Sequence, residues 1–262
     1  MQLDMFIVDA FADGPLSGNP AAVCPLEYWL PDELMQRIAD EMNLSETVFL
    51  VPTGDSFAIR WFTPTREVDL VGHATLAAGH IVLDRIRPSA TEVTFSSLGG
   101  TLSVARDGDR LAMNMPALVP KVAPAPTGLS VMLGAEPVAT LAAKHYLFVL
   151  EQAADVAGLN PDLAALARLP LPAVIVTAPA AFGSSYDFVS RFFAPANGVP
   201  EDPVAGVAHC CLSPYWSGRL GRAKLVGRQL SRRGGTVACE DCGDRVILGG
   251  KAVTVLTGRM MV

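Results

Sequence analysis

One pattern of residues occurs twice in this 262-residue chain, and an internal repeat constrains architecture before any other feature. The first copy reads Arg60-Trp61-Phe62-Thr63-Pro64 and the second reads Arg191-Phe192-Phe193-Ala194-Pro195. Acidic residues follow each copy, and then a glycine, Gly72 or Gly206, opens a run of small residues. The repeat predicts two related halves, each with a strand, an acidic turn and a helix that begins at the glycine.

The apolar periodicity around the repeat predicts a mixed α+β chain with many short strands. Strands are expected near residues 3–11, 46–51, 57–62, 92–96, 101–106, 111–115, 146–150, 173–177 and 187–193, and a helix from Asp32. Four prolines between Pro116 and Pro126 predict a linker, because proline cannot donate to a strand ladder. We therefore expect an N-terminal lobe over residues 1–119, to which the last strand can return, and a C-terminal lobe over 120–262.

Charge and hydropathy exclude several function classes. The chain has 20 basic and 26 acidic residues, a net charge of −6, and no basic run longer than Arg232-Arg233, which predicts no nucleic-acid partner. No apolar run reaches about 18 residues and the first residues lack a basic stretch, so we expect no membrane segment, no signal peptide and a cytoplasmic location. The odd number of cysteines predicts no disulfide framework, and Cys210 and Cys211 are expected to be buried packing residues.

The glycine that opens each predicted helix allows a ligand to approach the backbone closely. The first amide groups of a helix have no internal partners, and together with the helix dipole they favour an anion. Two such starts facing one another across a cleft would bind a carboxylate at Gly72 and Gly206. The alternative is that each glycine only permits tight packing of its helix on a sheet.

Three residues are candidates for acid–base chemistry. Glu46 opens an apolar run that ends at Val51, so its carboxylate would be partly removed from water, which suits proton transfer at carbon. The alternative, a strand-edge glutamate bonded to a neighbour, is the one that the residues alone favour. His73 follows the first helix-opening glycine and Asp202 precedes the second, so we expect them at corresponding places across one cleft. The alternative for both is a structural role, with Asp202 stabilised by the helix dipole.

The residues that a two-thiol racemase or a zinc site would require are absent, and those for thiol redox chemistry are poorly placed. A two-thiol racemase of this duplicated type needs a cysteine before each helix-opening glycine, but these positions are Val71 and Ala205. Cys239 and Cys242 have CxxC spacing, so a thiol redox protein stays an alternative, although the acids between them disfavour a reactive thiol. No second CxxC or paired histidines complete a zinc site, and we expect no metal.

Short motifs run in order along nearly the whole chain. They are Asp9-x-Phe11, Gly18–Val23, Leu44–Phe49, Arg60–Pro64, Glu67–Ala77, Arg191–Pro195, Glu201-Asp202-Pro203-x-x-Gly206 and Gln229-x-Ser231-x-Arg233-Gly234-Gly235. Together they resemble the PhzF-like isomerase family of phenazine biosynthesis. Each motif is weak alone, but their common order makes the resemblance specific.

The resemblance implies a diaminopimelate-epimerase-like α+β fold, in which each of two lobes is a β-barrel-like sheet around a central helix and the active cleft lies between the lobes. It also implies a homodimeric isomerase without a cofactor, whose glutamate takes a proton from a ring carbon of a dihydro-hydroxyanthranilate and returns one further along. By this likeness Glu46 is the acid–base group. His73 and Asp202 match polar substrate contacts, and Gly72 and Gly206 match the helix starts that hold the carboxylate.

The chain departs from the family pattern at one point. The common Asp-Pro-x-Thr-Gly-Ser-Ala reads here Asp202-Pro203-Val204-Ala205-Gly206-Val207-Ala208. Val207 offers only its backbone amide in place of a serine hydroxyl, and a lost hydrogen bond to a charged group costs about 1.5–3 kcal/mol. Val207 and Asn19 complete the expected substrate-binding residues. The sequence thus predicts an isomerase that moves a proton on a small carboxylate, with a catalytically silent carboxylate-binding protein as the alternative.

Overall fold

The computed structural model describes residues 1–262 and divides the chain into two compact units. Unit 1 comprises Met1–Met115 and Gly249–Val262, and unit 2 comprises Pro116–Leu248. The proline-rich stretch interpreted as a linker belongs to unit 2 and is held there. The Ala117 amide donates to the carbonyl of Asp244, and the Leu118 amide donates to the carbonyl of Cys210. The stretch thus begins at the boundary between the units, and these backbone bonds pack it against unit 2.

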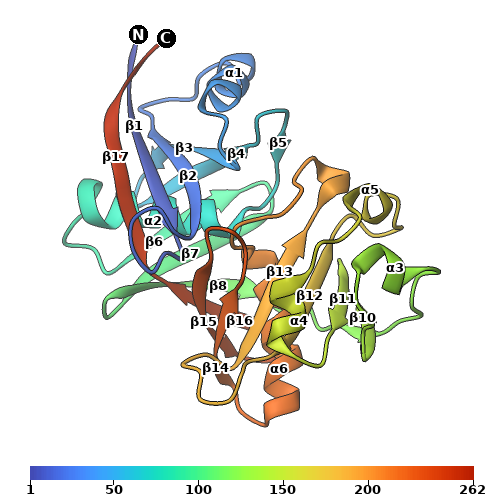
Figure 1. Cartoon of the computed structure of the whole chain (residues 1–262). Helices are drawn as coiled ribbons and strands as arrows, with labels where there is room; N and C mark the ends of the chain where they lie inside the picture. Colours follow the sequence, from blue (N-terminus) through green and yellow to red (C-terminus); the bar gives the residue numbers. More distant parts are fainter. The chain divides into compact units, whose positions relative to one another are not determined.

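Unit 1 combines a mixed sheet with two α-helices. Its elements are β1 (Gln2–Ala10), β2 (Asn19–Pro25), α1 (Asp32–Met42), β3 (Glu46–Thr53), β4 (Ser56–Phe62), β5 (Glu67–Val68), α2 (Gly72–Ile81), the π-helical turn η1 (Val82–Ile86), β6 (Glu92–Ser97), β7 (Gly100–Asp107), β8 (Arg110–Pro116) and β17 (Ala252–Met261). The first and last strands of the chain, β1 and β17, are antiparallel partners (Figure 1). The two chain ends therefore meet at one end of this strand pair.

Unit 2 has the same kind of composition. Its elements are β9 (Lys121–Val122), α3 (Leu129–Leu133), β10 (Ala139–Ala142), β11 (Tyr146–Val149), α4 (Ala153–Gly158), α5 (Leu163–Leu166), β12 (Val174–Pro179), β13 (Phe188–Phe193), the 3₁₀ turn η2 (Pro195–Asn197), α6 (Gly206–Leu220), β14 (Lys224–Gln229), β15 (Gly235–Asp241) and β16 (Arg245–Gly250). Its core packs Phe148, Val174, Val176, Val189 and Phe193 against the short helices α3, α4 and α5.

The strands of the two units pair in the same order. In unit 1, β2 is parallel to β3, β3 antiparallel to β4, β4 parallel to β6 and β6 antiparallel to β7. In unit 2, β11, β12, β13, β14 and β15 follow the same alternation. The sequence Gly-Gly-Thr occurs where β7 begins (residues 99–101) and where β15 begins (residues 234–236). This part of the repeat was not among the predicted features. The predicted duplication is therefore confirmed by strand pairing.

A buried helix lies at the centre of each unit. In α2 every residue is buried except His80, and strands β1, β2, β3, β7 and β17 all contact the helix. Because strands surround the helix, it requires apolar or small residues on all sides. In unit 2, α6 is buried at most positions from its first residue to Trp216. Each unit therefore has the central helix that the family resemblance implied.

The close packing of α2 predicts the effect of a single methyl group. A Cβ on Gly79 would lie 2.5 Å from Cγ1 of Val104, so Gly79→Ala is expected to destabilise unit 1 by about 1–3 kcal/mol. Gly218 in α6 has no atom within 4 Å of the same position, so Gly218→Ala is expected to stabilise by up to about 1 kcal/mol. Urea denaturation of both variants checks the pair, and equal effects would contradict the packing account.

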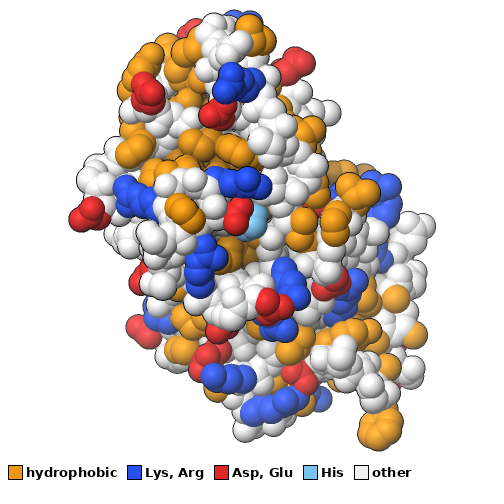
Figure 2. Space-filling model, turned by 90° about the vertical axis from the view of Figure 1, so that its left-hand side faces the viewer, with side chains coloured by type: hydrophobic (Ala, Val, Ile, Leu, Met, Phe, Trp, Pro, Cys, Tyr) orange, Lys and Arg blue, Asp and Glu red, His pale blue; other side chains and the backbone are white.

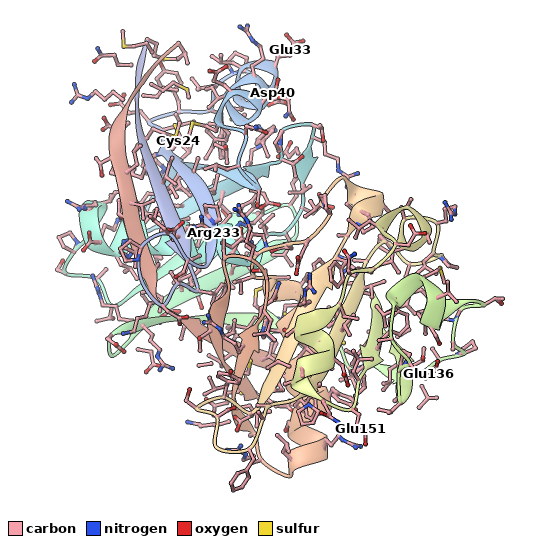
Figure 3. The ribbon with its side chains drawn as sticks, viewed as in Figure 1. Cys24, Glu33, Asp40, Glu136, Glu151 and Arg233 are labelled. Atoms are coloured by element: carbon pink, nitrogen blue, oxygen red, sulfur yellow. The ribbon has the colours of Figure 1, made fainter.

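The surface carries both signs of charge. Helix α1 buries Met35 and Ile38 and exposes Glu33 and Asp40, which Figure 3 shows on the helix. In Figure 2, basic and acidic side chains are interspersed over the face in view, and no continuous basic area covers it. None of the helices has both the length and the apolar character that crossing a bilayer requires.

Candidate active site

Local chain geometry places Glu46 on a particular face of its sheet. Helix α1 ends at Asn43, whose left-handed conformation (φ 48°) and bond from its amide to the Ala39 carbonyl stop the helix. Glu46 then begins β3. Phe49 packs against Met35 in the cluster below α1. Since side chains alternate along a strand, Glu46 points to the opposite face, where α2 packs.

Glu46 and His73 form a shielded acid–base pair. The distance from Oε2 of Glu46 to Nε2 of His73 is 3.1 Å, and the two side chains are 15% and 3% exposed. His73 is the second residue of α2, so the contact of this helix with β3 brings the imidazole to the carboxylate. The two atoms are buried and close but are not oriented for a hydrogen bond with each other. A carboxyl group and an imidazole held this near to one another are candidate groups for general acid–base chemistry.

Asn19 belongs to β2, the parallel neighbour of the strand that begins at Glu46. It begins β2, its side chain is fully buried, and its Oδ1 accepts a hydrogen bond of 3.3 Å from the hydroxyl of Ser45. Gly18 before it has φ +69°, and a Cβ there would lie 2.3 Å from the Ala10 carbonyl oxygen, so only glycine fits. Asn19 thus fixes the residue before Glu46. Its expected contact with substrate stays a prediction.

In unit 2, Asp202 shapes the turn that leads into α6. Its Oδ1 accepts a hydrogen bond of 3.0 Å from the amide of Val204. Asp202 and His73 do not occupy corresponding positions, which corrects the sequence prediction. The residue after the helix-opening glycine is His73 in unit 1 and Val207 in unit 2, whereas Asp202 precedes Gly206 by four residues. Strand register, and not proximity to the glycine, shows which polar residues correspond.

The two helices begin in the same way. The residues before Gly72 and Gly206 are Val71 and Ala205, both extended, and no side chain caps either helix. In both, the fourth residue of the helix bonds back to the carbonyl of that preceding residue, through the hydroxyl of Thr75 at 2.6 Å and the Nδ1 of His209 at 2.9 Å. The first amides of α2 and α6 therefore face no capping side chain, as an anion-binding helix start requires.

Strand register shows that Glu46 has no acidic counterpart in unit 2. The arginine of the repeat pairs with Phe49 in β3 and with Val176 in β12. Counting back three residues from each gives Glu46 and Ala173. Unit 2 therefore carries an alanine where unit 1 carries its carboxyl group, and a valine where unit 1 carries its histidine.

An arginine–glutamate brace repeats in both units, and the sequence analysis gave it no role. Arg60 donates from Nε and Nη2 to the two carboxylate oxygens of Glu67, both at 2.6 Å. Arg191 donates in the same way to Glu201, at 2.7 and 3.0 Å. Each brace joins the strand of the repeat to the acidic turn before the central helix. The sequence feature that could have revealed the brace is the recurrence of an arginine and a glutamate in both copies of the repeat.

Removing one of these arginine–glutamate braces is expected to lower the stability of its unit. Arg191→Met is expected to destabilise unit 2 by about 3 kcal/mol, because Glu201 is largely buried and would lose its partner. Arg259→Met serves as the matched control, since its pair with Asp4 is exposed and worth about 0–1 kcal/mol. Urea denaturation measures both. A loss for Arg191→Met no larger than for Arg259→Met would contradict the brace.

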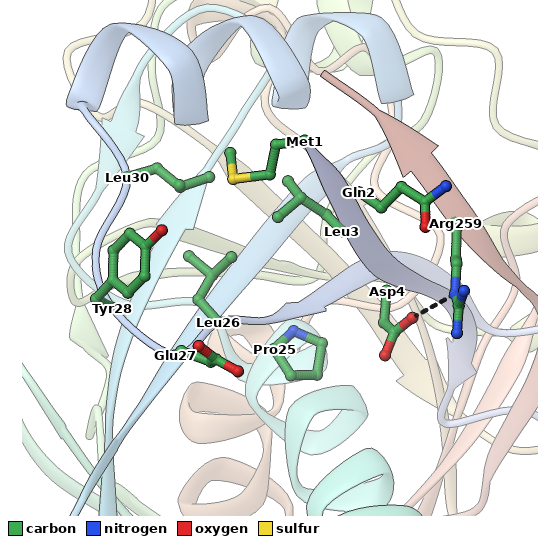
Figure 4. Close-up of a pocket in the computed structure, with 10 residues that line it drawn as sticks. All are labelled: Met1, Gln2, Leu3, Asp4, Pro25, Leu26, Glu27, Tyr28, Leu30 and Arg259. Atoms are coloured by element: carbon green, nitrogen blue, oxygen red, sulfur yellow. Dashed lines mark hydrogen bonds and ion pairs between the residues drawn. The ribbon is translucent and has the colours of Figure 1, made fainter.

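One pocket of about 430 Å³ lies elsewhere in unit 1, at the chain ends (Figure 4). Its lining residues are Met1, Gln2, Leu3, Asp4, Pro25, Leu26, Glu27, Tyr28, Leu30 and Arg259. None of these is a candidate site residue, and the ion pair between Asp4 and Arg259 already satisfies its charged groups on one side. This pocket therefore contains none of the candidate acid–base residues.

The five cysteines are free thiols, and all but Cys242 are buried. The expected burial of Cys210 and Cys211 is confirmed. Burial raises the pKa of the Cys239 thiol, with smaller contributions from Cys210 and Asp187, so burial rather than the acids between the two thiols dominates. A buried thiol with a raised pKa is a poor redox nucleophile.

Thiol labelling checks this directly. Iodoacetamide near pH 7 is expected to modify Cys242 in the folded protein, and the other four cysteines only after unfolding. Mass spectrometry of tryptic peptides reads the result. Rapid labelling of Cys239 in the native protein would revive the thiol redox alternative.

Comparison with solved structures identifies the class of protein. A PhzF-family structure from Enterococcus faecalis superimposes with a TM-score of 0.96 at 42% identity, covering 100% of both chains. A phenazine biosynthesis PhzC/PhzF protein from Clostridium difficile gives 0.93 at 38% identity, covering 99% and 100%. A hydroxyproline epimerase from Agrobacterium vitis gives 0.60 at 11% identity, over 98% and 92%, which shows the fold alone. The chain has the diaminopimelate-epimerase-like α+β fold, as predicted.

Sequence comparison then gives the family. The family model described as phenazine biosynthesis-like protein matches residues 8–258. Two proteins of Pseudomonas aeruginosa, both named uncharacterized isomerases, are 46% and 49% identical, each over 99% of both chains. The human phenazine biosynthesis-like domain-containing protein is 35% identical over 99% of both chains. The chain belongs to the phenazine biosynthesis-like, or PhzF, family.

Proposed function

We propose that this chain is an isomerase that needs no cofactor and moves a proton on a small, carboxylate-bearing substrate, with Glu46 carrying the proton. The observation that carries the proposal is the 3.1 Å separation of Glu46 and His73 in a site shielded from water. Oε2 of the carboxylate is buried beside Nε2 of His73, so we assign the proton transfer to the other oxygen, Oε1, which takes the proton from the substrate carbon. The electron pair of the broken C–H bond then delocalises into the conjugated system, and Oε1 returns the proton to a second carbon.

The unequal repeat supports a mechanism with one proton carrier. A racemase with two bases would place an acid–base group in each unit, but the positions that correspond to Glu46 and His73 hold Ala173 and Val207. In the proposed mechanism one carboxyl group, that of Glu46, therefore both takes the proton and returns it. Such a shuttle fits a proton shift along one face of a substrate better than inversion at one carbon.

We further propose that backbone amides stabilise the charge that develops on the substrate. The amides that begin α2 at Gly72 and α6 at Gly206 and Val207 are the candidate donors, with Asp202 and Asn19 as polar contributors. Preorganised donors of this kind commonly lower the barrier of such reactions more than any other single effect. A homodimer and a cytoplasmic location, which the sequence analysis led us to expect, stay predictions.

Deuterium incorporation tests the proposal. The native protein is incubated in D₂O with a panel of cyclic β-hydroxy and β-amino acids, and mass spectrometry follows uptake of deuterium at carbon. The proposal expects uptake in at least one member. Ligand-induced thermal stabilisation of about 2.7 kcal/mol at 100 times Kd, without any uptake, would instead support the silent carboxylate-binding protein that Val207 favours.

A further inference from the structure

The turn before α6 is held almost entirely by side chains from elsewhere in unit 2. Gln229, the last residue of β14, has no exposed surface. Its Oε1 accepts a hydrogen bond of 3.0 Å from the amide of Ala205, and its Nε2 donates one of 2.7 Å to the carbonyl of Asp202. One buried amide side chain thus spans the turn from its first residue to its last.

The carbonyl side of Ala205 is held as well. His209, also without exposed surface, contacts the Ala205 carbonyl through Nδ1 at 2.9 Å, and its own amide donates to the same oxygen at 3.3 Å. Because a carbonyl can only accept, Nδ1 carries the proton and the imidazole is in one tautomer. Ala205 is therefore clamped through both its N–H and its C=O by two fully buried side chains.

A third side chain completes the support. The hydroxyl of Ser231 donates to the Pro203 carbonyl at 2.7 Å and accepts from the Gly234 amide at 3.0 Å. In unit 1, strand register puts Ser97 at the position of Gln229, and its hydroxyl donates to the Gly100 carbonyl at 2.9 Å instead of to the turn. The backbone itself comes close there, because a Cβ on Gly99 would lie 2.9 Å from the Asp69 carbonyl oxygen. Polar side chains therefore hold the turn in unit 2, whereas close backbone approach holds it in unit 1.

We infer that Gln229 and His209 are positioning residues that aim the first amides of α6 at the substrate carboxylate. The inference rests on the proposed function, since it assigns Gly206 and Val207 to carboxylate binding. Val207 provides no hydroxyl, so recognition of the carboxylate in unit 2 depends on backbone amides. The orientation of these amides depends on the side chains that fix the turn before α6. A buried clamp that removes the freedom of Ala205 lets these amides bind a carboxylate without first being ordered.

Hydrogen exchange and a model carboxylate test the inference in the full chain. Gln229→Leu removes both bonds to the turn, and its matched control is Thr177→Val, which removes the bond from Trp216 Nε1 to Thr177 Oγ1 further along the same helix. Gln229→Leu is expected to speed amide exchange over residues 203–208 by about tenfold or more, whereas Thr177→Val leaves that segment unchanged. Ser231→Ala, at a partly exposed position, is a second variant that is expected to loosen the same segment to a smaller extent.

Binding is measured with benzoate, and with benzamide as the uncharged comparison. Gln229→Leu is expected to weaken benzoate at least tenfold, with no such loss for Thr177→Val. Unchanged exchange over 203–208 in Gln229→Leu and Ser231→Ala, or equal benzoate affinity in Gln229→Leu and native protein, would overturn the inference. A native protein that binds benzamide as tightly as benzoate would contradict the carboxylate site of the proposed function, while the exchange measurement still decides whether the clamp holds the turn.

Discussion

Replacing Glu46 with glutamine is expected to slow deuterium incorporation into a substrate carbon by about 10²–10⁴-fold, the usual contribution of a general acid–base group. The amide of glutamine has nearly the same size as the carboxyl group and can keep the contact with His73, but it cannot accept a proton from carbon. Substrate affinity should change little, because the substitution removes the proton carrier and leaves the backbone donors in place. Mass spectrometry in D₂O gives the rate, and titration calorimetry gives the affinity.

The matched control for this variant is Glu92→Gln. Glu92 begins β6 as Glu46 begins β3, but it is exposed and its strand does not place it beside a histidine. The control is expected to keep the native rate. Equal deuterium incorporation by the native protein and by Glu46→Gln would remove Glu46 from the mechanism.

Acid should weaken the fold through its buried histidines. Burial lowers the pKa of His209 from 6.5 to about 4, with the bond to the Ala205 carbonyl opposing the shift in part. Between these values the unfolded chain binds the proton and the folded chain does not, so stability is complete above about pH 6.5 and falls as the pH drops towards 4. At 1.36 kcal/mol for each unit of pKa, the loss from His209 is about 3 kcal/mol.

One variant shows how much of this pH dependence of stability comes from His209. His209→Gln keeps a donor that can reach the Ala205 carbonyl but has no charge to gain, so its urea midpoint should fall less steeply between pH 6.5 and 4. His145, whose pKa burial also lowers to about 4, should contribute a similar share that remains in this variant. Parallel stability curves for the native protein and His209→Gln across this range would show that His209 does not couple protonation to folding.

Local patterns in the sequence predicted much of this molecule. The strand that begins at Glu46 and the helices that begin at Gly72 and Gly206 are where the periodicity placed them. They are recoverable because alternation and helix starts depend on residues near one another in the chain. The repeat was recoverable because both copies retain the apolar strand and the glycine.

What the sequence could not show depends on contacts between distant residues. Asn19 meets Ser45 across 26 residues and Gln229 meets Asp202 across 27, and no local pattern marks either pair. The match of His73 with Asp202 was wrong because His73 follows its glycine by one residue, whereas Asp202 precedes its own by four. Unit 2 also has a longer connection from its proline to its glycine, and η2 and an isolated bridge between Ala194 and Val199 take up the added length. Strand register, and not letter order, shows which residues correspond.

The central claim is that one carboxyl group takes the proton and returns it, and internal return of the proton tests this most directly. Unlabelled substrate is converted in D₂O, and the earliest product is analysed by mass spectrometry for hydrogen at the carbon that receives the proton. Transfer by Glu46 predicts that part of the first product carries the original hydrogen and the rest carries deuterium, because return of the proton to carbon competes with exchange between the shielded carboxyl group and solvent. Product that carries only deuterium at that carbon from the first turnover would contradict the claim, since no hydrogen would then pass directly from one carbon to the other.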